Sequence, residues 1–209
     1  MSKIKVCHLY YDIMNLYGEN ANIRAIEKMC EYQGITCEVS LKTINDKIDF
    51  NSYDIYYMGS GDEKSELLVL EDLIKYKDKI KASIESGKTF IITGNASELF
   101  GSYIVDNGIK YDALGVFNYN SIHEAFRIVG SVTFSTKLIK EKIIGFQNRC
   151  GIMNDIDKPL FKVISGTGSS INSKTEGIHY KNFFATYVFG PLLIRNPYFT
   201  NYILKNIMK

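Results

Sequence analysis

Cysteine and histidine are scarce in this 209-residue chain, and their spacing excludes two common kinds of small scaffold. The cysteines are too few and too scattered for a disulfide framework, and they lack the paired C-x-x-C of a structural zinc site. With so few histidines a zinc centre is hard to assemble, so we expect no metal and no other cofactor. The residues concerned are Cys7, Cys30, Cys37, Cys150, His8, His123 and His179.

An excess of charge and a long hydrophobic run are also missing. The 25 Lys and Arg residues nearly balance the 23 Asp and Glu residues, which excludes the strongly basic face of a nucleic-acid binder. No apolar run approaches the roughly 20 residues that a membrane-spanning helix needs. The first residues lead directly into a strand-like pattern without the apolar segment of a signal peptide. We therefore expect a soluble, cytoplasmic protein.

Apolar residues are abundant, at 45% of the chain, and no linker or repeat divides it, so we expect one domain over residues 1–209. In the first half, strand-like and helix-like patterns alternate, which predicts a parallel sheet covered on both faces. In the second half, short β-rich segments predict an antiparallel extension. The predicted strands are 4–10, 35–44, 54–58, 88–93, 127–134, 142–148, 160–164, 178–180 and 184–188, and the predicted helices are 20–33, 65–86 and 198–208.

Two glycine turns follow neighbouring predicted strands, one at residues 59–61 and one at residues 94–95. Ligands gather at the carboxyl ends of parallel strands, and exposed backbone N–H groups at such turns form anion or oxyanion sites. For either turn alone, glycine that merely allows a tight bend is the simpler explanation. Two turns at adjacent strand ends together indicate a shared crevice.

The strand at residues 90–93, the turn at Gly94 and the following residues have the layout of a nucleophile elbow. The apex of such an elbow carries a serine or cysteine, because nucleophilic catalysis needs an activated hydroxyl or thiol. Glycine has neither group. Ser97 and Glu98 are explained more simply as residues favoured at a helix N-terminus.

Four stretches resemble the class I glutamine amidotransferases of the cobyric-acid-synthase type, and within them the subgroup that works with a Mur-ligase-like synthetase on peptidoglycan precursors of the cell wall. The resemblance implies an α/β fold: a three-layer, flavodoxin-like arrangement with a mostly parallel central sheet and an antiparallel β extension. In the family the elbow carries the catalytic cysteine and a later Thr-Tyr-Leu-His-Gly-Pro run carries the catalytic histidine. Gly94 and Phe189 stand at these two positions here. The four stretches are 11–23, 58–61, 176–182 and 185–193.

The resemblance also implies where glutamine would bind. Arg127 matches an arginine expected to hold the glutamine carboxylate, although an arginine on a strand surface is an equally good explanation. The glycine turns add Gly59, Gly61 and Asn95 to this candidate site. Residues Gln147, Arg149 and Cys150 depart from the family pattern in what we expect to be a pocket-forming loop. His179 lies where the family also has a histidine, which favours a structural role.

These features leave three hypotheses. The first is a pseudoenzyme that serves as a binding or regulatory partner of a Mur-ligase-like synthetase. The second is a working glutaminase subunit that supplies ammonia, and the third is a glutamine sensor. We expect Phe189 to plug the glutamine pocket, and we expect an exposed apolar docking surface near residues 15–22 and 147–154.

Overall fold

The computed structural model describes residues 3–208 and contains two six-stranded sheets. The first sheet has the order β11-β12-β4-β3-β1-β2, in which five strands run parallel and only β11 is antiparallel. This agrees with the expected mostly parallel central sheet. Its strands are β1 (Lys3–Leu9), β2 (Thr36–Lys42), β3 (Ile55–Met58), β4 (Thr89–Thr93), β11 (Ile178–Tyr180) and β12 (Phe183–Thr186).

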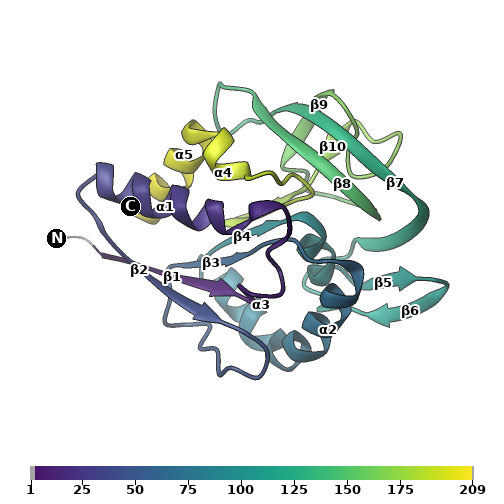
Figure 1. The fold of residues 1–209 in the computed structure, drawn as a ribbon, viewed down its shortest axis with the longest axis horizontal. Coiled ribbons are helices and arrows are strands. Elements are labelled where there is room, and N and C mark those ends of the chain that lie inside the picture. The colour runs from purple at the N-terminus through teal and green to yellow at the C-terminus, as the bar shows by residue number, and fades with distance from the viewer. Residues whose placement is uncertain (1–2, 209) are drawn as a thin grey trace.

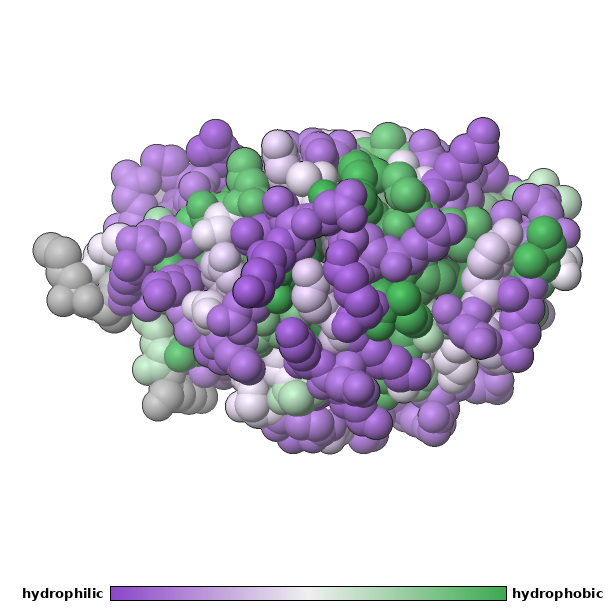
Figure 2. All heavy atoms as spheres, turned by 90° about the horizontal axis from the view of Figure 1, so that it is seen from below, coloured by the Kyte–Doolittle hydropathy of each residue, from purple (hydrophilic) through white to green (hydrophobic). Residues whose placement is uncertain are grey.

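Helices cover both faces of this sheet, and alternate strand residues supply the two cores (Figure 1). Tyr56 and Met58 of β3 pack on the face that carries the two middle helices of the chain, α2 (Glu63–Leu73) and α3 (Lys77–Glu85). Ile55 and Tyr57 point to the opposite face. The outer surface of the middle helices is mainly hydrophilic (Figure 2). One face carries α1 (Asn20–Tyr32), α4 (Leu192–Arg195) and α5 (Pro197–Ile207), and the other carries α2 (Glu63–Leu73) and α3 (Lys77–Glu85).

The helix predicted for residues 65–86 is wrong as a single element. It divides into α2, a 3-10 turn at Ile74–Tyr76, and α3. Tyr76 has a non-helical backbone with φ −102° and ψ 5°. Its buried ring packs on Phe50, and its hydroxyl donates to the Asp46 carbonyl oxygen. Tertiary contacts of Tyr76 therefore accompany the break, and neither glycine nor proline is present there to signal it.

The second sheet is predominantly antiparallel, with β8 and β9 on either side of the long strand β7. A hairpin of β5 and β6, which the sequence patterns did not predict, extends it, and β5 runs parallel to β7. The register of β7 against β8 shifts between His123 and Ile128, and such bulges redirect side chains. The strands are β5 (Tyr103–Asp106), β6 (Ile109–Asp112), β7 (Asn120–Ser135), β8 (Ile143–Asn154), β9 (Phe161–Ser165) and β10 (Thr175–Glu176).

Candidate functional site

A cavity of about 200 Å³ lies between the carboxyl ends of β3 and β4 and the face of β7 and β8. The parallel register aligns Met58 with Ile92, so the turns that follow these residues lie side by side. Ser60 and Gly61 line the cavity from the first turn, and Gly94 and Asn95 line it from the second. The two glycine turns therefore share one crevice, as their spacing in the sequence indicates.

Gly94 occupies the sharp turn directly after β4. Its φ of +65° lies in the left-handed region, where a side chain is strained. A Cβ atom at this position would overlap the side chain of Ser60. The structure thus places at the turn a residue with no reactive atom, in a space that has no room for a side chain unless Ser60 moves.

Asn95 uses the backbone donor that the glycine turn would otherwise offer to a ligand. The Gly61 N–H and the Ser60 hydroxyl both donate to Asn95 Oδ1, each at 3.0 Å. The Asn95 amide in turn donates to Glu66 Oε2 at 2.9 Å. The expectation of an exposed N–H group at this turn is therefore wrong for Gly61, because a side chain of the protein occupies that donor.

Phe189 is buried, with 3% of its surface exposed, and it forms one wall of the cavity. Its ring stacks on Tyr17, with 4.5 Å between the centroids and 9° between the planes. Its backbone N–H donates to the Phe146 carbonyl oxygen at 3.1 Å. The expected burial is confirmed. The ring does not fill the pocket, however, because the cavity remains beside it.

Arg127 reaches the cavity from β7, where the register shift ends. Its guanidinium donates to Glu63 Oε1 at 2.7 Å and to the Asn148 side-chain oxygen at 2.8 Å. Although partial burial opposes ionisation, the hydrogen bonds from Arg127 and Cys150 lower the pKa of the Glu63 carboxyl to about 2. A glutamine carboxylate at this place would have to compete with Glu63 for the guanidinium.

Cys150 lies in strand β8 and not in a loop, so that prediction is wrong. Its thiol lines the cavity and donates to Glu63 Oε1 at 3.1 Å. Burial, followed by the nearby Glu63 carboxylate, raises the pKa of the thiol to about 12. The thiol therefore stays protonated at neutral pH and is a poor nucleophile.

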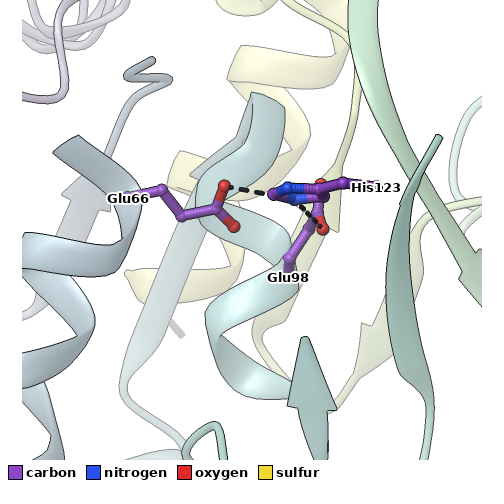
Figure 3. A group of neighbouring side chains, drawn as sticks. All are labelled: Glu66, Glu98 and His123. Carbon is purple, nitrogen blue, oxygen red and sulfur yellow. Dashed lines mark hydrogen bonds and ion pairs between the residues drawn. The ribbon is translucent and has the colours of Figure 1, made fainter. Parts of the chain in front are cut away.

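Glu66, Glu98 and His123 all line the cavity, and their side chains point toward one another (Figure 3). They come from α2, from the 3-10 helix at Gly94–Phe100, and from β7. His123 Nε2 lies 3.1 Å from Glu98 Oε2 and 3.6 Å from Glu66 Oε2. Burial favours neutral imidazole, but the hydrogen bonds and charges of Glu98 and Asp106 outweigh it and raise the pKa of His123 to about 9. Burial, and then the charge of Glu98, raises the pKa of Glu66.

This cluster was missed by sequence analysis. The sequence pattern favours Glu98 as a residue at a helix N-terminus, yet its side chain is completely buried against His123. The three residues are 25 or more positions apart along the chain, and no local spacing connects them.

Two further candidates lie outside the cavity lining. Gly59 packs behind it, where a Cβ atom would lie 2.5 Å from the Met14 carbonyl oxygen and 2.7 Å from Glu19 Cβ. Gly59 therefore allows the chain around Met14 and Glu19 to pack closely against this turn. His179 belongs to β11 and stacks on Phe184, and burial lowers the pKa of its imidazole. These contacts agree with a structural role for His179.

A mostly parallel sheet between two layers of helices, with a sharp turn and a cavity at adjacent strand ends, defines an α/β domain whose candidate site lies at the carboxyl edge of the sheet. The model of the CobB/CobQ-like glutamine amidotransferase domain matches residues 5–197, and the chain belongs to this family. A relative from Streptococcus pneumoniae, the GatD subunit of lipid II isoglutaminyl synthase (glutamine-hydrolyzing), is 31% identical over 93% of this chain and 76% of its own length. The subunit of the same name from Staphylococcus aureus is 30% identical over 98% of this chain and 84% of its own length.

Proposed function

We propose that this chain is a GatD-like amidotransferase subunit that no longer hydrolyses glutamine and acts as a binding or regulatory partner of a Mur-ligase-like synthetase. The observation that carries the proposal is Gly94. A covalent thioester route needs a nucleophilic atom at the elbow, and Gly94 supplies none. Phe189 adds to this, because a phenyl ring cannot take up the proton that a thiol or hydroxyl would release.

Other side chains at the cavity do not replace the missing pair. The Cys150 thiol donates to a carboxylate that raises its pKa, which is the reverse of an activated cysteine. Both ring nitrogens of His123 lie within 3.1 Å of carboxylate oxygens, from Asp106 and Glu98. Its raised pKa favours the protonated imidazolium, which cannot act as a base.

The partner is inferred from the relatives and from the cavity rim. Both relatives are named as subunits of a synthase, which supports a synthetase as the partner here. Leu16 and Tyr17 lie at the rim, inside the region expected to dock a partner, and are 38% and 47% exposed. Tyrosine is enriched among the residues that anchor protein complexes. None of the helices in residues 3–208 has the length and apolar character to span a membrane.

The alternative is a working glutaminase subunit, which the words "glutamine-hydrolyzing" in the relatives' names favour. It would require a nucleophile other than residue 94. A glutamine sensor needs only binding, for which Arg127, Gly61 and Asn95 at the cavity and Gly59 behind it are the candidates.

The experiment combines an ammonia assay with a binding assay. We expect no ammonia release from glutamine by the purified chain, alone or with the Mur-ligase-like protein of its source organism, and we expect a complex of the two in native mass spectrometry. Replacing Tyr17 by Ser is expected to weaken that complex about tenfold or more. The matched control is Tyr32→Ser, because Tyr32 is 84% exposed on α1 and lies outside the cavity lining. Ammonia release that a glutamine-analogue alkylating agent abolishes would overturn the proposal, and calorimetry with glutamine separates the sensor from the partner subunit.

A further inference from the structure

The cluster of Glu66, Glu98 and His123 has the composition and spacing of a metal site. One atom from each side chain, two carboxylate oxygens and one imidazole nitrogen, lies within 4.8 Å of the others. Tetrahedral zinc with bonds of about 2.0–2.1 Å to nitrogen and oxygen holds its ligand atoms about 3.3 Å apart. The observed separations from His123 Nε2 to the two carboxylates, 3.1 Å and 3.6 Å, lie on either side of that value.

A fourth residue orients the imidazole in the way that metal-bound histidines require. His123 Nδ1 lies 2.9 Å from Asp106 Oδ1 on the neighbouring strand β5. A carboxylate on Nδ1 holds a proton there, so a metal ion between the two glutamates would displace only the proton on Nε2 and bind to that nitrogen. This carboxylate–histidine arrangement is typical of zinc ligands, in which it sets the tautomer and increases basicity.

Buried oxygens without partners provide an independent indication of a missing ligand. Glu66 and Glu98 are both completely buried, and among residues 3–208 neither Oε1 atom has a hydrogen-bond partner. Leaving such atoms unpaired is costly in free energy, more so for a charged group. Gly151 is paired with His123 in the sheet and makes room for the Glu98 carboxylate, because a Cβ atom at residue 151 would overlap Glu98 Oε1.

We propose that Glu66, Glu98 and His123 bind a divalent transition-metal ion, for which Zn²⁺ is the best fit. Two carboxylates balance the charge of the ion, and imidazole together with carboxylate oxygen is a ligand set that zinc accepts. All three residues also line the cavity, so water or a small ligand in the cavity would complete the coordination. The site does not use residue 94 as a ligand, and so the proposal does not depend on whether glutamine is hydrolysed.

The test uses the full chain, freed of metal by a chelator and then dialysed against Zn²⁺. We expect about one zinc ion per chain by elemental analysis and a rise in melting temperature that the chelator reverses. With Co²⁺ as the probe, we expect the intense visible absorption of a four- or five-coordinate ion. Glu98→Gln and Glu66→Gln preserve the shape of the side chains but remove a ligand charge, and each should weaken zinc binding about tenfold or more.

Cys150→Ser and His179→Gln are the matched controls. Among residues 3–208, Cys150 is the only cysteine that lines the cavity, and His179 is a histidine that lies outside the cavity lining. We expect both control variants to bind zinc as the unmodified chain does. Binding that Cys150→Ser abolishes, or that the glutamate variants leave intact, would overturn the assignment. So would the absence of bound zinc and of a Co²⁺ spectrum in the unmodified chain, a result that does not depend on any variant folding.

Discussion

The two walls of the cavity differ sharply in chemistry. The wall at the strand ends of the parallel sheet contributes Ser60, Gly94 and Asn95, and it holds its polar atoms in bonds to one another. The opposite wall, on β7 and β8, contributes ionisable groups, among them His123 and Cys150. An amidotransferase elbow belongs to the first wall. The helices that follow the same strand ends add carboxylates to that wall, whereas the cationic side chains of the cavity come from β7 and β8.

This difference shows how locally the chemistry of a fold can change. The parallel sheet needs only a chain able to turn after β4, and glycine satisfies that need without supplying a reactive atom. The antiparallel strands bring His123 and Arg127 against carboxylates of the first wall, so that these charged groups are paired. A cavity can therefore lack the residues of one reaction and still carry strongly interacting side chains.

Restoring the first wall is the change with the largest expected effect. The triple variant Gly94→Cys, Phe189→His, Asn95→Gly supplies a thiol and a base, and it frees the Gly61 N–H from the Asn95 side chain. We expect ammonia release from glutamine to rise from background to a measurable rate, limited by the overlap of a new Cβ atom with Ser60. The measurement is an ammonia assay with purified variants.

Gly94→Cys alone is the control for that experiment. Phe189 cannot accept the thiol proton, so the single variant should show only slow alkylation and no turnover. A single variant as active as the triple variant would mean that the second position is not needed, and that the two walls do not divide the chemistry as described.

Phe189→Ala is expected to lower the free energy of unfolding by about 3–5 kcal/mol, the usual cost of removing a buried phenyl ring. The stacked Tyr17 ring and the edge-on Phe146 ring both lose their partner. Denaturant unfolding measures the change, with Phe126→Ala as a control, because Phe126 is 44% exposed. An effect no larger than that of the control would place the ring outside the packed core.

Cys150 should react slowly with alkylating agents, because burial and the Glu63 carboxylate raise its pKa to about 12. We expect alkylation at about pH 8 to be on the order of 1,000-fold slower than for the same cysteine in the unfolded chain, because the thiolate fraction falls about tenfold for each unit of pKa. Glu63→Gln should accelerate it, since the variant removes the charge that opposes the thiolate. Mass spectrometry of peptides follows the rate, and rapid labelling in the folded protein would show that the second wall holds a reactive thiol.

The smallest effect concerns pH. Burial, opposed by hydrogen bonds from Thr186 and the Tyr187 N–H, raises the pKa of Glu176 to about 7. The native state then keeps a proton that the unfolded chain loses above its ordinary pKa of 4.5. The stabilisation is complete below that pKa and disappears as pH rises towards 7, so stability should fall by about 1–3 kcal/mol over this window.

Glu176→Gln removes this proton equilibrium, and its unfolding free energy should change less between about pH 5 and pH 7.5 than that of the unmodified chain. Denaturant titrations at both pH values give the comparison. An identical pH dependence for the two proteins would mean that Glu176 is ionised throughout.

The sequence by itself determined the parallel sheet, the two glycine turns and the identity of the residues at positions 94 and 189, because these follow from local patterns and from collinear motifs. It also placed Gly61, Gly94, Asn95, Arg127 and Phe189 at one site, and the structure brings all five to the same cavity.

Only the tertiary structure decided how the two walls of the cavity meet. Glu66, Glu98 and His123 come from a helix, a 3-10 turn and a strand, and a contact between such distant positions depends on how the two sheets pack. Contacts around the first sheet direct Asn95 onto Gly61 and accompany the break of the predicted helix at Tyr76, whereas the approach of β7 places Arg127 against Glu63. Periodicity in the sequence predicts which face of an element is buried. It does not predict the partner of a buried charge, because that partner comes from an element far away in the chain.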